Sequence, residues 1–113
     1  MKISGSDISM VRGDSETIVV SVNNEDGSLR PLEEGDTIYF TVKKDAHTKE
    51  KALQKVITDF VDGTALIKIE PEDTRNLMYR PYVYDIQLTE ADGTVTTIIK
   101  KSTFRVSEEV NHE

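Results

Sequence analysis

The chain has 113 residues, of which 36% are hydrophobic and 31% charged, so it is long enough to form one domain around a buried core. Its 21 acidic and 14 basic residues give a net charge of -7, which repels phosphate backbones and anionic lipids and argues against nucleic-acid or membrane partners. Cysteine is absent, which excludes disulfides and thiolate chemistry and favours synthesis in a cytoplasm.

Short stretches in which apolar and polar residues alternate begin near the N-terminus, where no apolar run resembles a signal peptide. We expect a first strand at 8–11, a bend at Arg12-Gly13-Asp14 and a strand over 17–22 with alternate residues directed inward. The tripeptide at the bend also occurs as an integrin ligand, but a tight turn explains it better. Turn residues at 23–27 then lead to a strand over 36–43.

The middle of the chain is less regular. A polar loop is expected at 45–50, followed by a strand over 52–58 in which either Val56 or Ile57 could face inward. Asp62-Gly63 predicts a hairpin turn before a strand over 64–70. Proline followed by acidic residues at 71–77 indicates one short helical turn.

The last third has the clearest strand pattern. Tyr82, Tyr84, Ile86 and Leu88 alternate with polar or smaller residues, and the turn at 91–93 contains a glycine. Strands over 95–101 and 103–107 are expected to complete the structure, with Phe104 and Val106 facing the core.

These elements predict an all-β fold: an immunoglobulin-like antiparallel β-sandwich of about seven or eight strands with one short helical turn. No window of helical periodicity is long enough for the crossover helices that a parallel sheet requires. We expect one domain over 1–113, with a core of about 8–107 and a mobile tail at 108–113.

No pattern of residues predicts catalysis. His47 and His112 have no partner at useful spacing, and no serine lies in a nucleophile motif. The oxygen-rich turn at Asn23-Asn24-Glu25-Asp26 lacks the ligand spacing of a calcium loop. The sequence therefore predicts no catalytic residue, no metal or cofactor site and no enzyme.

Two classes of binding function stay open. Some residues directed away from the core favour packing against another sheet, and we take six as a candidate interaction surface: Val19, Thr37, Tyr39, Thr41, Tyr79 and Ile98. An assembly module would use such residues to contact protein. A sugar-binding module would instead place Tyr39 or Tyr79 beside carboxylates, although the chain has no tryptophan platform.

Six segments follow one another along the chain: Val11-Arg12-Gly13-Asp14-Ser15, Ile38-Tyr39-Phe40-Thr41-Val42-Lys43, Pro71-Glu72-Asp73-Thr74 through Leu77, Tyr82-Val83-Tyr84-Asp85-Ile86-Gln87-Leu88, Asp92-Gly93-Thr94-Val95-Thr96-Thr97 and Phe104-Arg105-Val106. In this order they resemble small β-sandwich proteins encoded in phages and prophages of Gram-positive bacteria, including the N-terminal domain of the baseplate upper protein of lactococcal-type phages. The resemblance covers about Met10 to Val106.

The resemblance implies a structural part of a virion or prophage, in the tail, the baseplate or the receptor-binding apparatus. Such a part would bind copies of itself or other tail or baseplate proteins, would form homo-oligomers and would need no cofactor. It would be made in the bacterial cytoplasm and then incorporated into a virion. Tyr82-Val83-Tyr84 also resembles the immunoglobulin tyrosine corner, which implies a hydrogen bond between the Tyr82 hydroxyl and the backbone.

Overall fold

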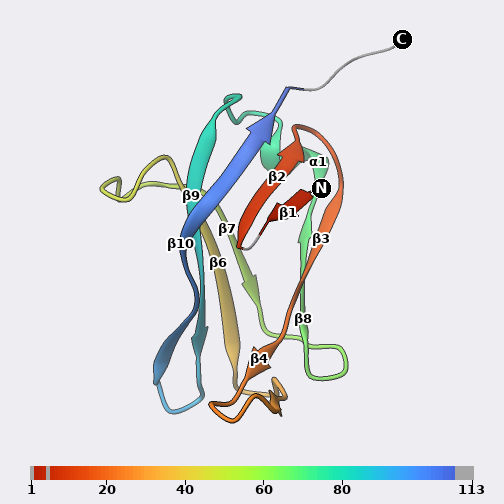
Figure 1. The fold of residues 1–113 in the computed structure, drawn as a ribbon, viewed down its shortest axis with the longest axis vertical. Coiled ribbons are helices and arrows are strands. Elements are labelled where there is room, and N and C mark those ends of the chain that lie inside the picture. Colours follow the sequence, from red (N-terminus) through yellow and green to blue (C-terminus); the bar gives the residue numbers. More distant parts are fainter. Residues whose placement is uncertain (1, 5, 109–113) are drawn as a thin grey trace.

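The computed structural model describes residues 2–4 and 6–108, with side chains from Ser6 onward. Figure 1 shows the described residues as strands with a single helical turn. The elements are β1 (Lys2–Ser4), β2 (Asp7–Val11), β3 (Glu16–Val20), β4 (Val22–Asn23), β5 (Leu29–Arg30), β6 (Thr37–Lys43), β7 (Lys51–Ile57), β8 (Ala65–Ile69), α1 (Pro71–Thr74), β9 (Pro81–Thr89) and β10 (Val95–Ser107).

Two layers enclose the core. One is a six-stranded sheet in the order β1-β2-β10-β9-β6-β7, and the other is the pair β3-β8, with β4-β5 as a small ribbon at one end (Figure 1). The predicted fold class, an immunoglobulin-like all-β sandwich, is confirmed. Among the described strands, seven have five or more residues, which agrees with the predicted number.

The prediction of a wholly antiparallel structure is wrong for one pair of strands. β2 and β10 run parallel, with Ile8 opposite Phe104 and Val11 opposite Ser107. β2 pairs with β1 on one side, and after β2 the chain crosses to β3 in the other layer, so the other side of β2 is left for the last strand. Alternation of apolar residues is the same in both strand directions, so it could not reveal this pair.

The inward faces are those that the alternation predicts. Ile38, Phe40 and Val42 of β6 are fully buried, and so are alternate residues of β8, β9 and the end of β10. At the centre, the ring of Phe40 lies 5.5 Å from that of Tyr84 and 5.9 Å from that of Phe104, measured between ring centroids. Such tilted aromatic contacts add to the energy of burial.

The sequence left open whether Val56 or Ile57 of β7 faces inward. Ile57 packs against the core, whereas Val56 is 50% exposed. Most predicted strands agree with the observed ones to within one residue at each end, but two predicted divisions of the chain into strands are wrong. The stretch 17–22 divides into β3 and β4, whereas 95–107 is one continuous strand. Register shifts between Thr97 and Ile99 and between Ile99 and Ser102 let β10 remain paired with β9 across the expected break.

The turns follow the local sequence. Asp62 and Gly63 both have positive φ, 51° and 76°, as the predicted hairpin turn requires. The predicted helical turn is α1, where the Glu70 backbone N–H donates to the Asp73 carboxylate at 2.7 Å. Lys55 of β7 pairs with the same carboxylate at 2.7 Å and so ties α1 to the large sheet.

The predicted tail at 108–113 lies, apart from Glu108, outside the described residues. Within the residues that the structure describes, no helix is long and apolar enough to span a membrane.

Candidate interaction surfaces

The six residues of the predicted interaction surface fall in three separate regions. Thr37, Tyr39 and Thr41 are half-buried on the outward side of β6. Val19 and Ile98 line a groove beside β3. Tyr79 lies in the segment between α1 and β9.

The outward face of β7, β6 and β9 carries a polar depression of about 390 Å³, which we call the sheet-face trough. It is lined by Tyr39, Thr41, Lys43, Lys51, Gln54, Asp85, Gln87 and Thr89. Strand pairing sets this arrangement, because Thr41 lies opposite Gln54 on one side and opposite Asp85 on the other. The Gln54 amide donates to the Thr41 hydroxyl at 3.0 Å.

A smaller hollow of about 140 Å³ adjoins the trough and shares Thr41, Lys43 and Asp85 with it. Its other lining residues come from the loop after β6, from β9 and from β10: Ala46, Val83, Tyr84 and Lys101. Lys101 belongs to the part of β10 where the register shifts. The irregular pairing of β10 therefore adds a cation from a third strand to this face.

Beside β3 the sandwich has an apolar groove of about 190 Å³, which we call the β3 groove. It is lined by Ser6, Ile8, Ile18, Val19, Val20, Ser21, Tyr84, Ile86, Ile98 and Ile99. The groove exists because β2 pairs only with the last four residues of β10, so on the side away from β9 no described strand lies beside the preceding part of β10. Val19, at the rim, is 63% exposed.

Ile98 does not face outward as the alternation predicted. The register shift between Thr97 and Ile99 breaks the alternation, and both Ile98 and Ile99 pack against the core. Ile98 is therefore partly buried in the wall of the β3 groove.

The side chain of Tyr79 is in contact with Arg12 of the bend after β2. The Arg12 guanidinium lies 4.1 Å from the centre of its ring and also donates to the Tyr79 hydroxyl. Gly13 has a φ of 87°, and its N–H donates to the buried Thr74 hydroxyl at 2.9 Å. The bend predicted at Arg12-Gly13-Asp14 is confirmed, and its contacts hold it against α1 and the segment after it.

The predicted hydrogen bond to Tyr82 is present. The Met78 N–H donates to the Tyr82 hydroxyl at 2.9 Å, and the tyrosine side chain is almost fully buried. Phe60, in the segment between β7 and β8, packs in part against the core.

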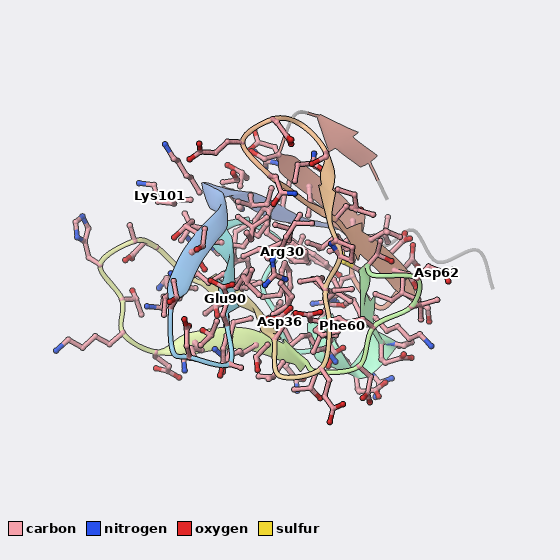
Figure 2. All side chains as sticks on the ribbon, turned by 90° about the horizontal axis from the view of Figure 1, so that it is seen from below. Arg30, Asp36, Phe60, Asp62, Glu90 and Lys101 are labelled. Atoms are coloured by element: carbon pink, nitrogen blue, oxygen red, sulfur yellow. The ribbon has the colours of Figure 1, made fainter. Side chains whose placement is uncertain are left out.

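A charged cluster that the sequence did not predict lies at the end of the sandwich near β4 and β5 (Figure 2). Arg30 donates to both Asp36 carboxylate oxygens, at 2.6 and 3.3 Å, and to Glu90 at 3.0 Å. The Glu33 N–H adds a bond of 3.0 Å to Asp36, which is 4% exposed. The hydrogen bonds from Arg30 lower the pKa of Asp36 despite its burial.

This cluster joins three separate segments, since Arg30 ends β5, Asp36 precedes β6 and Glu90 follows β9. No short motif contains the three residues, so only a prediction of strand pairing could have found them. The Arg30 guanidinium donates hydrogen bonds to both carboxylates, so each charge in the cluster has a partner of opposite sign. Such an arrangement is typical of ion pairs with a structural role.

Among the described residues, 2–4 and 6–108, no group of three or more histidine or acidic side chains could hold a metal ion. His47 is exposed in the loop after β6, and His112 lies outside the described residues. The Asp26 carboxylate accepts hydrogen bonds from the Ser28 N–H and hydroxyl, at 2.9 and 2.5 Å, in the turn between β4 and β5.

A scan of protein-family models and a search of curated proteins find no match to this chain.

Proposed function

We propose that the protein is a non-enzymatic assembly module that binds a protein partner along the β3 groove. The observation that carries the proposal is the character of this groove. Although 31% of the chain is charged, none of the groove's lining residues carries a charge. Core residues such as Ile8 and Ile86 line it together with Val19, which is 63% exposed at the rim, so an apolar side chain of a partner protein can insert there.

The backbone of β3 adds a second means of binding. In the part of the chain that the structure describes, β3 pairs only with β8, so its other edge has unpaired backbone groups. An extended segment can pair with such an edge and place alternate side chains in the adjoining groove. The partner that fits is therefore a β-strand with apolar residues at every second position.

β3 has few of the features that normally protect an edge strand, and its one charged residue, Glu16, is at its first position. It contains no proline or lysine, and its pairing with β8 from Glu16 to Val20 has no register shift. β10 borders the same groove and differs in both respects, because it carries Lys100 and Lys101 and two register shifts. The partner strand is therefore expected on β3.

We propose further that this partner is another copy of the protein or a neighbouring component of a phage or prophage tail or baseplate. The order of motifs between Met10 and Val106, which resembles that of such proteins, supports this assignment. A β-sandwich that acts by being bound needs no catalytic centre.

The test is the mass of the protein in solution, measured by light scattering on a size-exclusion column over a series of concentrations. We expect a discrete oligomer that Val19→Lys converts to a monomer, because the new charge blocks the β3 edge. The matched control is Val56→Lys, which adds the same charge at a 50% exposed valine on β7.

A strict monomer would exclude self-assembly through β3. The neighbouring tail proteins would then be tested for co-purification with the wild type and both variants. Equal capture by the wild type and Val19→Lys would contradict the proposal, because the added lysine lies at the rim of the proposed contact.

A further inference from the structure

We propose that the sheet-face trough, together with its adjoining hollow, binds an acidic oligosaccharide. This site is independent of the assembly function, since it lies on the outward side of β7, β6 and β9 and uses none of the β3 residues.

The charge of this face is opposite in sign to that of the whole chain. Lys43, Lys51 and Lys101 line the two depressions, against the single carboxylate of Asp85, whereas the chain has a net charge of -7. Lysines gathered around a depression attract anions even on a protein whose net charge is negative. The ligand is therefore expected to carry carboxylate, phosphate or sulfate groups.

Polar side chains in the trough are free to bind hydroxyl groups. Within the described residues, the Asp85 carboxylate, the Gln87 amide and the Tyr39 hydroxyl have no protein hydrogen-bond partner. A carboxylate offers only acceptors and an amide offers both donors and acceptors, so together they match neighbouring hydroxyls on a sugar ring. The half-buried ring of Tyr39 adds an apolar face with a polar tip, against which a sugar ring can pack.

The backbone beneath the trough argues against a peptide ligand. β6 pairs with β7 on one side and β9 on the other, and β9 pairs with β6 and β10. β6 and β9 therefore have no unpaired edge to hold the main chain of a peptide, and the unpaired edge of β7 lies on the side away from β6. A ligand in the trough must therefore bind through side chains. A hydroxyl-rich chain with anionic groups suits this arrangement of short polar side chains, lysines and one tyrosine.

The experiment is a titration of the ¹⁵N-labelled full chain, followed by amide chemical shifts in NMR spectra. The probes are tetragalacturonate, a hyaluronan hexasaccharide and a heparin-derived tetrasaccharide, which differ in linkage and in acidic group. Fully methyl-esterified tetragalacturonate is the neutral control, and poly-L-glutamate is the control for charge without sugar. We expect at least one acidic sugar to shift amides of β6, β7 and β9, and neither control to do so.

Variants then separate recognition from simple attraction. Lys43→Gln should weaken binding by about two- to fivefold, as expected for one exposed ion pair, and Tyr39→Ala should abolish it. The matched control is Lys68→Gln on β8, an exposed lysine outside the trough, which should leave the affinity unchanged. The spectrum of each free variant shows whether it is folded.

Three results would overturn the proposal. The first is the absence of shifts on this face with all three acidic sugars at millimolar concentration. The second is equal binding of poly-L-glutamate, which would reduce the site to an unspecific positive field. The third is binding that survives both Tyr39→Ala and Lys43→Gln.

Discussion

Replacing Asp36 with asparagine tests whether the charged cluster stabilises the end of the sandwich. Asp36 accepts two hydrogen bonds from Arg30 and one from the Glu33 N–H, and the asparagine side chain retains only part of this capacity and no charge. Breaking a buried ion pair costs about 3–5 kcal/mol, and an exposed pair contributes less than about 1 kcal/mol.

The cluster lies between these limits. Asp36 is 4% exposed, but the Arg30 side chain is 22% exposed and keeps Glu90, itself 37% exposed, as a partner. We therefore expect Asp36→Asn to lower the free energy of unfolding by about 2–3 kcal/mol.

Urea unfolding at pH 7, followed by circular dichroism, measures this loss, with Glu25→Gln in the exposed turn between β4 and β5 as a control that changes little. A cycle with Arg30→Met should give a coupling energy of about 1–2 kcal/mol, since the two residues share hydrogen bonds. A loss below about 0.5 kcal/mol for Asp36→Asn would refute the reasoning, because the pair would then behave as a surface ion pair.

The same cluster predicts a dependence on pH. The hydrogen bonds from Arg30 lower the pKa of Asp36 in the folded state, whereas an aspartate in an unfolded chain has a pKa of about 3.9. On acidification, the unfolded chain therefore takes up a proton at Asp36 before the folded chain does. The contribution of the ionised Asp36 to stability is complete above about pH 4 and is lost as the pH is lowered further. Asp36→Asn should reduce this acid sensitivity without abolishing it, because turn hydrogen bonds also lower the pKa values of Asp26, Asp45 and Asp92.

Two further predictions concern single positions, both measured by urea unfolding. Tyr82→Phe should cost about 1 kcal/mol, because the Met78 N–H loses its acceptor; an unchanged stability would remove any role for this bond. Gly35→Ala should be more destabilising than Gly27→Ala, although both glycines have a positive φ. A Cβ atom at Gly35 would lie 3.0 Å from the Cβ of Ala91, whereas a Cβ atom at Gly27 would have no atom within 4 Å. Equal losses at the two glycines would mean that the contact with Ala91 relaxes without cost.

The features that the sequence predicted correctly are those with a local physical cause. Alternation determines which side chains of β6 and β9 reach the core, and Asp62-Gly63 supplies the positive φ values that its turn needs. Proline and the Asp73 carboxylate define the start of α1 in the same way.

The features that the sequence did not reveal depend on pairing between distant segments. The direction of β2 beside β10 and the inward position of Ile98 both follow from how β10 is paired. The trough likewise requires Lys43 and Asp85 to lie on neighbouring strands, and Lys101 of the adjoining hollow comes from β10, in the part of that strand where the register shifts. Residue types alone could not indicate these arrangements.

The two proposed sites differ in what each presents to a ligand. β3 offers an unpaired backbone edge beside an apolar wall, which suits a polypeptide, whereas the trough lies on paired strands and offers only side chains. Because β3 belongs to the smaller layer and the trough to the outward face of the larger one, a strand bound at β3 leaves the trough open (Figure 1). Val19→Lys should therefore abolish assembly while leaving the sugar-induced shifts unchanged, and Tyr39→Ala should have the converse effect.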